Sequence, residues 1–368
     1  MPEHNLYGAA LSADQLTETL THLFKTGLDA QKQDNPATPI CIWGLHGIGK
    51  TMLVEDFAQA HGWEFTSCSP AQFEEMGDLN GLPILDQQNE RQVTSFAPPS
   101  WVPSQPGPGI LLLDDINRAD DRILRGIMQL LQRSALFSWQ LPKNWQIVAT
   151  ANPEGGDYSV TPMDDAILTR MLHVSLVFDP KSWAKWARNN DVDPRGIAFV
   201  LTYPEAVTGR RTTPRSLTQF FEQLKTIPDL KAQERLVYTL ASSALDEATV
   251  SSFMAFVNDN LQQLIDPAEI VSTADFSTIS KRMMDLSQGG VRMDLLSTVC
   301  TRLLLHLCHP QFDAPPTCAD NLVSFLMLDC LPTDLRVSLH RDLVTEAPTN
   351  VRQMLQDPRL ATLLLSGM

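Results

Sequence analysis

The chain has 368 residues, of which 43% are hydrophobic and 19% charged. This composition is typical of a folded protein of about two or three domains and not of a disordered one. Its 28 Lys and Arg against 43 Asp and Glu give a formal net charge of −15, which disfavours general affinity for nucleic acid or for an anionic membrane surface. No apolar run approaches the roughly 20 residues of a membrane span, the first residues lack a secretory signal, and the six cysteines include no C-x-x-C pair. We therefore expect a soluble protein of a reducing cytoplasm.

Strands and helices are expected to alternate in the first half of the chain. Residues 1–37 are predicted to hold one amphipathic helix, which begins at the capping-box pattern of Ser12 and Gln15 and ends at Gly27. Helical spacing of apolar residues predicts two further helices, over residues 50–61 and 119–132. Short apolar runs predict five strands, at residues 39–43, 64–68, 110–113, 145–150 and 171–178. Continuous apolar strands between helices are typical of a parallel sheet covered on both faces.

Two regions depart from this alternation. Residues 71–108 are acidic and rich in loop-forming residues, and we interpret them as an insertion into the α/β core that could form a hairpin. In it, Trp101 lies between prolines and is expected to be a packing anchor rather than a binding hot spot. Its acidic residues fit either a solvated loop or a surface for a basic or metal-linked partner: Glu74, Glu75, Asp78 and Asp86. After residue 180 only helical patterns follow, so we expect an α/β core at residues 38–180, a helical lid at 181–230 and a helical domain at 231–368.

A phosphate-binding loop is predicted at residues 44–51, which match G-x-x-x-x-G-K-[ST] between a strand and a helix. The glycines allow consecutive backbone N–H groups to curl around a β-phosphate, and the helix adds the positive end of its dipole. Lys50 would reach the β- and γ-phosphate oxygens, and Thr51 would offer its hydroxyl to Mg²⁺. ATP is therefore expected to contact Gly44, His46, Gly47, Ile48, Gly49, Lys50, Thr51 and Met52.

A second element of the same site is predicted where the apolar run at residues 110–113 ends in Asp114 and Asp115. A strand that delivers two carboxylates at its carboxyl end suits a metal–nucleotide site. Asp114 would hold Mg²⁺, through water, together with Thr51. Asp115 would orient and polarise the attacking water.

Residues 114–119, DDINRA, closely resemble the DEINRA signature of MoxR-type AAA+ ATPases. Three more segments resemble that family's motifs in the family's order. Residues 149–153 are similar to its sensor-1 strand end, residues 163–170 to the segment that ends in the arginine finger, and residues 210–215 to the sensor-2 segment. The likeness covers roughly residues 10–230. Beyond about residue 235 the chain more weakly resembles a subgroup whose genes often neighbour those of von Willebrand factor A domain proteins.

This resemblance implies a P-loop AAA+ core with a helical lid, assembled as a ring, usually a hexamer, with ATP at each subunit interface. Asn152 would hold the attacking water and contact the γ-phosphate. Arg170 would act from the neighbouring subunit on the transition-state charge, although an arginine at a helix end also fits a solvated position. Arg215 would report the γ-phosphate from the same chain, with Arg210 and Arg211 as competitors for that role. For Arg118, a second role at the subunit interface and a role as a cap on the protein surface are equally compatible with the sequence.

The resemblance also implies a function: a chaperone that uses ATP to remodel or assemble a partner protein, with a von Willebrand factor A domain protein as one candidate. The family usually has Glu where this chain has Asp115. The aspartate side chain reaches about 1.5 Å less far than that of glutamate. We therefore expect slow hydrolysis of ATP. Two alternative functions stay open: an ATP-gated scaffold with little turnover, and a motor that acts on nucleic acid. The net charge disfavours the second of these. The group of His306, Cys308 and His309 is too small for a typical zinc site, and packing is expected there instead.

Overall fold

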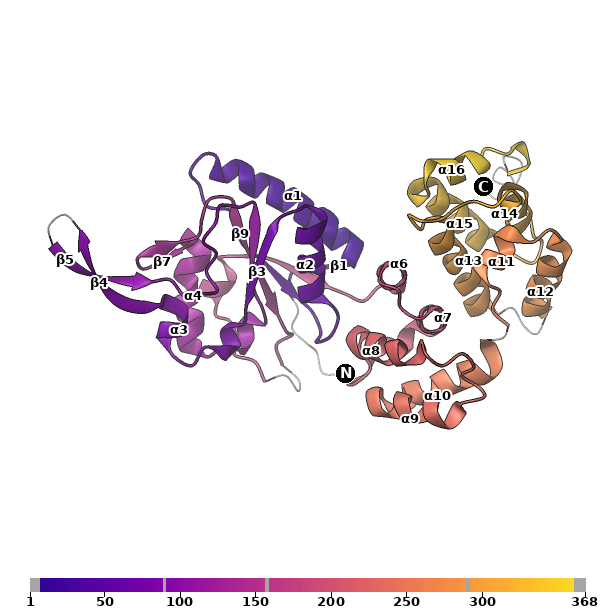
Figure 1. Ribbon diagram of the computed structural model, residues 1–368, viewed down its shortest axis with the longest axis horizontal. Helices are drawn as coiled ribbons and strands as arrows, with labels where there is room; N and C mark the ends of the chain where they lie inside the picture. Colours follow the sequence, from indigo (N-terminus) through magenta and orange to yellow (C-terminus); the bar gives the residue numbers. More distant parts are fainter. Residues whose placement is uncertain (1–6, 89–90, 156–158, 262, 289–291, 361–368) are drawn as a thin grey trace. The chain divides into compact units, whose positions relative to one another are not determined.

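The computed structural model describes residues 7–88, 91–155, 159–261, 263–288 and 292–360. The chain divides into two compact units, Met1–Asp179 and Pro180–Met368 (Figure 1). The first unit is an α/β core and the second is built from helices. These two features confirm the fold class expected from the sequence.

A six-stranded parallel sheet forms the centre of the first unit. From one edge to the other its strands are β1 (Ala9–Leu11), β10 (Leu172–Leu176), β2 (Ile40–Trp43), β9 (Trp145–Ala151), β6 (Gly109–Leu113) and β3 (Glu64–Cys68). All five predicted strands are present in it. The sequence did not predict β1, because it is only three residues long and two of them are exposed.

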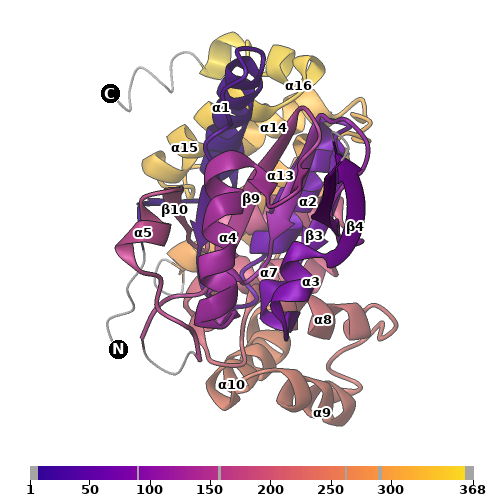
Figure 2. The same cartoon turned by 90° about the vertical axis from the view of Figure 1, so that its left-hand side faces the viewer.

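Helices cover both faces of this sheet, as the apolar strands indicated. Alternate strand residues point to opposite faces, so Ile110 packs under α1 (Ala13–Gln31) and α2 (Lys50–Ala60), while Leu111 packs under α4 (Asp121–Arg133). Figure 2 shows α4 in front of the sheet. Helix α4 begins two residues later than expected because Asp120 is its N-cap and accepts a hydrogen bond from the Ile123 N–H at 2.9 Å.

The predicted end of the first helix at Gly27 is wrong, since α1 continues to Gln31. Gly27 is buried inside the helix, where a Cβ atom would lie 2.2 Å from the Gln146 Oε1 atom. The Gln146 Nε2 group donates a hydrogen bond to the Phe24 carbonyl at 2.8 Å. Glycine is therefore needed here to make room for a buried side chain of strand β9 and not to stop the helix.

The insertion between β3 and β6 contains a 3-10 turn at Pro70–Gln72, helix α3 (Met76–Asn80) and an antiparallel pair, β4 (Leu82–Gln88) with β5 (Arg91–Ala97). Trp101 donates a hydrogen bond to the Asp78 carbonyl at 3.0 Å and contacts the rings of Phe73 and Trp139, so it is a packing residue.

A second short pair, β7 (Ala135–Leu136) with β8 (Trp139–Gln140), was not predicted from the sequence because each strand has only two residues.

The described residues of the second unit form helices and turns without a strand. The helices are α6 (Pro180–Asn189), α7 (Pro194–Thr202), α8 (Pro214–Leu224), α9 (Glu234–Ala244), α10 (Glu247–Ala255), α11 (Pro267–Ser272), α12 (Phe276–Gln288), α13 (Met293–Leu307), α14 (Cys318–Leu326), α15 (Thr333–Glu346) and α16 (Thr349–Met354). Shorter helical turns lie at Pro204–Thr208 and Phe256–Asn260. Most side chains of α13 are buried, and its Thr298 lies 3.1 Å from Thr202 of α7, hydroxyl to hydroxyl. Among the helices that the structure describes, none combines the length and the apolar character that crossing a membrane requires.

Candidate nucleotide site

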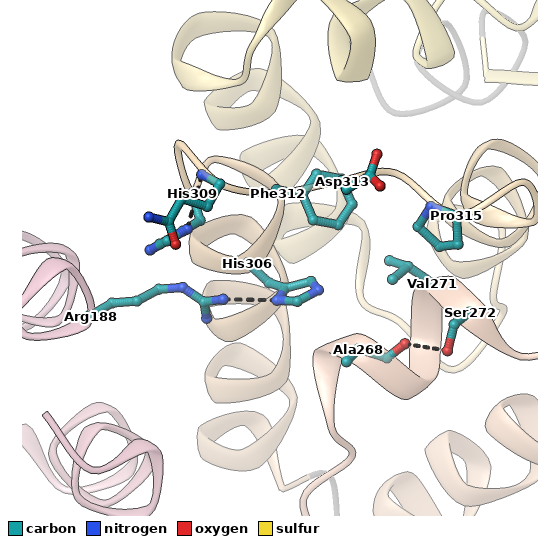
Figure 3. Close-up of a pocket in the computed structure, with 10 residues that line it drawn as sticks. Arg188, Ala268, Val271, Ser272, His306, His309, Phe312, Asp313 and Pro315 are labelled. Carbon is teal, nitrogen blue, oxygen red and sulfur yellow. Dashed lines mark hydrogen bonds between the residues drawn. The ribbon is translucent and has the colours of Figure 1, made fainter. Parts of the chain in front are cut away.

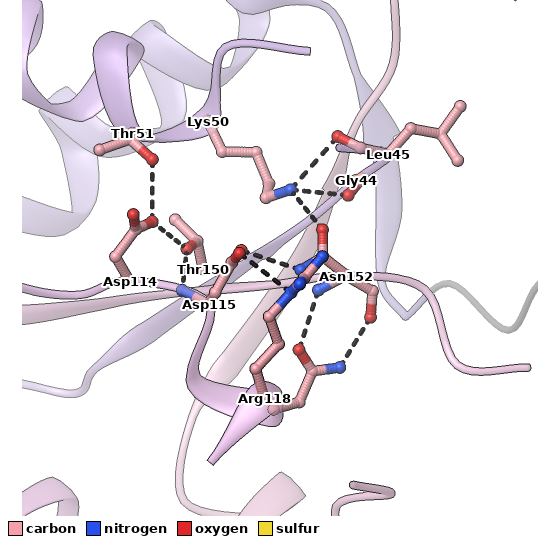
Figure 4. A network of polar contacts seen from close by, with 10 residues as sticks. Gly44, Leu45, Lys50, Thr51, Asp114, Asp115, Arg118, Thr150 and Asn152 are labelled. Carbon is pink, nitrogen blue, oxygen red and sulfur yellow. Dashed lines mark hydrogen bonds and ion pairs between the residues drawn. The ribbon is translucent and has the colours of Figure 1, made fainter. Parts of the chain in front are cut away.

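Three neighbouring strands of the sheet, β2, β9 and β6, end at the same edge because they are parallel. The residues that follow them carry the polar groups predicted from the sequence: Lys50 after β2, Asp114 and Asp115 after β6, and Asn152 after β9. Figure 4 shows these side chains directed toward one another across the strand ends. The carboxyl edge of a parallel sheet is where ligands of α/β proteins bind.

The loop at residues 44–49 is shaped by its glycines. The Gly44 N–H donates to the Ala151 carbonyl at 3.2 Å, and a Cβ atom on Gly44 would lie only 3.0 Å from the Leu176 carbonyl oxygen. Gly47 and Gly49 have φ angles of +70° and +104°, which L-residues with side chains rarely adopt. A Cβ atom on Gly49 would meet no described atom within 4 Å, so the space in front of the loop is open.

Helix α2 begins at this loop without a side-chain cap, because its N-cap residue is Gly49. Its first backbone hydrogen bond joins the Leu53 N–H to the Gly49 carbonyl at 2.9 Å, so the N–H groups of residues 50–52 have no acceptor within the helix. Such groups bind phosphate well, both as donors and through the helix dipole. His46 and Met52 are exposed beside the loop, whereas the side chain of Ile48 packs on the core below it.

Lys50 is 6% exposed, and its ammonium group lies among three neutral oxygens. Its Nζ atom donates to the carbonyl oxygens of Gly44 at 2.8 Å and Leu45 at 3.2 Å, and to the Asn152 Oδ1 atom at 3.2 Å. An anionic ligand against the loop would bring negative charge to this buried cation, an arrangement that strengthens both hydrogen bonding and charge pairing. The loop and Lys50 together therefore fit a polyphosphate.

A hydroxyl group and a carboxylate meet next to Lys50. The Thr51 Oγ1 and Thr150 Oγ1 hydroxyls donate to the Asp114 Oδ1 atom at 2.8 and 2.7 Å. Burial, and secondly Asp114, raise the pKa of the neighbouring Cys68 thiol to about 12, so this group stays neutral beside the carboxylate. Hydroxyl and carboxylate oxygens are the ligands that Mg²⁺ prefers, and it commonly takes only one or two from the protein. The pair of Thr51 and Asp114 therefore fits a Mg²⁺ ion held jointly with a polyphosphate.

Asp115 has left-handed backbone angles, with φ +51° and ψ +46°. Aspartate tolerates this region better than most residues, and residues in such conformations are frequent at functional sites. Its Oδ1 atom accepts a hydrogen bond from the Asn152 Nδ2 group at 2.9 Å, and its Oδ2 atom lies 3.2 Å from the Arg118 Nε atom. The Asp115 N–H donates to the Thr150 hydroxyl at 2.8 Å, which fixes the backbone in this position.

Two positioning residues of this network, Asn117 and Thr150, were missing from the predicted site. The fully buried Asn117 donates through Nδ2 to the Asn152 carbonyl at 2.8 Å and accepts from the Asn152 N–H at 3.0 Å. Thr150 connects the backbone of Asp115 with the side chain of Asp114. Both lie in segments that the motifs already contained. The available signal was a polar residue inside an otherwise apolar strand for Thr150, whereas Asn117 lies in the turn Ile116–Arg118.

Residues 39–171 match the family model of the AAA domain, dynein-related subfamily. The match lies within the first unit, whose α/β fold is that of an AAA+ P-loop core. AAA domains in general bind nucleotide with Mg²⁺ and hydrolyse it, which agrees with the polyphosphate and metal fit of the site.

Several solved structures are similar to the chain at low identity. RuvB of Thermotoga maritima, a Holliday junction branch migration motor, shares 14% identity over 77% of this chain and 89% of its own, with a TM-score of 0.35. NtrX of Brucella abortus shares 14% over 93% of this chain and 69% of its own, with a TM-score of 0.37. A comparison with curated proteins finds no match.

Arg170 lies at the amino edge of the parallel sheet, opposite the carboxyl edge that carries the nucleotide site. It follows α5 (Asp165–Leu168) and directly precedes β10, whose first residue, Leu172, pairs with the first residue of β2, Ile40. Since β2 spans four residues at about 3.3 Å each, the side chain of Arg170 does not reach Lys50 of its own chain. Its Nη1 group donates to the Ala166 carbonyl, and its buried Nε group has no partner in the part of the chain that the structure describes.

Arg215 belongs to the second unit, where it is exposed in the first turn of α8. Its competitor Arg211 has a structural contact: the Nη2 group donates to the Ser243 carbonyl at the end of α9 at 2.7 Å, and the Arg211 N–H donates to Asp246 at 2.9 Å. A cation in the first turn of a helix is unfavourable for the helix dipole. Helix stability therefore does not account for the arginine at position 215.

The residues at 306–309 form no metal site. His306 accepts a hydrogen bond from Arg188 at 2.8 Å, and burial raises the pKa of the Cys308 thiol to about 11, which keeps it protonated. Among the described residues, no group of three or more His, Cys, Asp or Glu side chains could hold a metal ion. All six cysteines are free.

Proposed function

We propose that this protein is a MoxR-type AAA+ ATPase that binds Mg-ATP at Lys50, hydrolyses it slowly and uses it to remodel a partner protein. The observation that carries the proposal is the meeting of the Thr51 hydroxyl and the Asp114 carboxylate at 2.8 Å, beside the buried ammonium of Lys50. This combination supplies a cation for phosphate oxygens and oxygen ligands for Mg²⁺ at one strand edge. The bound metal would neutralise charge on the β- and γ-phosphates.

The hydrolytic step is assigned to Asp115 and Asn152. The Asn152 amide contacts Lys50 through its oxygen and Asp115 through its nitrogen, so it lies between the phosphate side and the carboxylate side of the site. In this position the amide can orient a water molecule against the γ-phosphate while Asp115 accepts hydrogen bonds from that water. The short side chain of Asp115 reaches less far than glutamate, which is the reason for expecting a low rate.

Ring assembly is proposed from the place of Arg170. Its distance from the nucleotide site of its own chain leaves it without a role there, whereas a neighbouring subunit could bring it to the γ-phosphate of the adjacent site. Such arginines are worth about 10³–10⁵ in rate in other NTPases. A hexamer and a von Willebrand factor A domain partner are proposed from the resemblance of the motifs alone, and Arg215 is proposed as the residue that couples the γ-phosphate to the helical lid.

A second candidate function is an ATP-gated scaffold with little turnover. The observation that favours it is the ion pair of Asp115 with Arg118, because a paired carboxylate is less available to a water molecule. A motor that acts on nucleic acid is disfavoured by the net charge of −15, and stimulation of turnover by DNA would speak for it.

The experiment that tests the proposal measures phosphate release and mass on the same purified protein. We expect slow ATP hydrolysis that requires Mg²⁺ and an oligomer whose population increases with ATP over ADP. Oligomers without phosphate release, alone or with a partner, would favour the scaffold. A monomer with ATP, with ADP and without nucleotide would contradict the action of Arg170 on a neighbouring subunit.

A further inference from the structure

The second unit contains a cavity of about 400 Å³ that the proposed ATPase cycle does not use. It lies between helices α6, α11 and α13 and the segment at residues 309–315 (Figure 3). A volume of this size is in the range of small-molecule sites, which are typically about 300–1,000 Å³. Its lining combines a cationic wall with an apolar one.

The cationic wall consists of Arg188 from α6 with His306 and His309. The Arg188 Nη2 group donates to the His306 Nδ1 atom at 2.8 Å, so the proton of this imidazole is on Nε2. The His309 Nδ1 atom accepts from the Gln311 N–H at 3.2 Å, which places the proton of His309 on Nε2 as well. The buried Arg188 Nε group has no hydrogen-bond partner among the described residues. Because the Nδ1 atoms of both imidazoles accept hydrogen bonds, their Nε2–H groups are the donors that this wall can offer to a ligand.

The charge on this wall is incompletely balanced. No carboxylate forms an ion pair with Arg188 in the described part of the chain; the nearest acidic influence on it is Asp266, whose carboxylate accepts a hydrogen bond from the Ala268 N–H at 2.9 Å. Burial, and secondly Arg188, lower the pKa of His306 to about 4, so this imidazole is neutral at pH 7. Asp313 also lines the cavity, but Figure 3 shows its carboxylate on the far side of the Phe312 ring from Arg188.

The apolar wall lies opposite and is formed by Ala268 and Val271 of α11 with Phe312 and Pro315. The Phe312 ring meets the His306 imidazole edge to face, with 5.1 Å between the ring centroids. Phe312 thereby holds the imidazole from one side while leaving its own apolar surface at the cavity. A ligand that fits both walls has an anionic end and a compact apolar body.

We propose that this cavity binds a small organic acid, with its carboxylate on the Arg188 guanidinium and the His306 imidazole and its apolar body against Val271 and Phe312. A planar guanidinium binds a carboxylate through paired hydrogen bonds. A carboxylate is favoured over a phosphate dianion because four of the ten lining residues are apolar and because Asp266 reduces the positive charge near Arg188. Occupancy would tie α6 to α11 and α13, since the wall residues come from all three helices.

The test uses benzoate as the probe, with benzamide as its neutral counterpart and inorganic phosphate as the third arm. Titration of the full-length protein, followed by NMR shifts of the probe, is expected to give a benzoate Kd in the low millimolar range. Benzamide and phosphate should bind at least about tenfold more weakly, because one lacks the charge and the other the apolar body. Measurements without nucleotide keep this result independent of the ATPase proposal.

Three variants assign the binding to this cavity. Arg188→Gln is expected to weaken benzoate binding at least about tenfold, and the control Arg282→Gln, an exposed arginine paired with Glu269, should leave it unchanged. Ala268→Trp keeps every cationic group but fills the cavity from an exposed position, so it should abolish binding even if Arg188→Gln fails to fold. The proposal is overturned by equal binding of benzamide, by tighter binding of phosphate, by unchanged benzoate binding in Ala268→Trp, or by no benzoate binding to the wild type at about 20 mM.

Discussion

The Asn152 amide nitrogen lies 2.9 Å from the Asp115 carboxylate, while the oxygen of the same amide lies 3.2 Å from the Lys50 ammonium. One side chain thus joins the predicted phosphate-binding cation to the predicted water-orienting carboxylate. The position of this amide is fixed by Asn117, which makes two hydrogen bonds to the backbone of Asn152. The roles proposed for these residues lead to separate, measurable expectations.

Replacement of the Asp115 side chain tests the hydrolytic step. Asp115→Asn is expected to reduce turnover by about 10² or more, because a carboxamide does not act as a base, while the Kd for Mg-ATP stays the same. Asp115→Glu should instead raise turnover, since the longer side chain reaches the water, at a loss of up to about 1 kcal/mol in stability from its left-handed backbone. Phosphate release and thermal unfolding check the two effects. Unchanged turnover in Asp115→Asn would remove this residue from the mechanism.

Arg118 tests whether the ion pair with Asp115 restrains hydrolysis. Arg118→Ala frees the Asp115 Oδ2 atom but leaves the hydrogen bond from Asn152 in place, so we expect turnover to rise severalfold with an unchanged Kd for Mg-ATP. Arg133→Ala, at the exposed end of α4, is the matched control and should change neither quantity. A fall in turnover specific to Arg118→Ala would mean that the arginine itself takes part in hydrolysis.

Arg170 tests the use of residues from neighbouring subunits. Arg170→Ala and Asp115→Asn should each reduce turnover by about 10² or more when expressed alone, since every interface then lacks one group. In co-expressed mixed rings about a quarter of the interfaces regain both groups, and turnover should recover toward about a quarter of the wild-type value. Absence of recovery in rings shown by mass spectrometry to contain both chains would contradict the proposal.

Gly27 gives a prediction on stability rather than activity. Alanine is favoured over glycine in a helix by about 1 kcal/mol, yet a Cβ atom here would collide with the Gln146 side chain. Displacement of Gln146 also removes its hydrogen bond to Phe24, so Gly27→Ala is expected to destabilise the protein by about 1–3 kcal/mol. Urea unfolding measures the change. A gain in stability would show that Gln146 moves aside without cost.

The sequence was sufficient for the core of the sheet and for the residues that gather at its edge. The strands could be predicted because a parallel strand with both faces buried is continuously apolar, and the motif residues could be placed because parallel strands end at one edge. The sequence was insufficient where the role of a residue depends on a contact with a residue far away in the chain. Gly27 resembled a helix end, and only its contact with Gln146 shows that this glycine makes room for the Gln146 side chain. The pairing of Arg118 with Asp115 and the support from Asn117 also depend on side-chain geometry that spacing does not reveal.

A titration of the wild type and of Lys50→Ala with Mg-ATP shows whether the loop at residues 44–51 binds the nucleotide. We expect the wild type to bind with a Kd below about 1 mM and Lys50→Ala to bind at least about tenfold more weakly, because the ammonium is lost from the phosphate loop. Lys25→Ala, at an exposed position on α1, serves as the control and should bind like the wild type. Equal affinities of the wild type and Lys50→Ala, or no uptake by the wild type at millimolar Mg-ATP, would contradict the account.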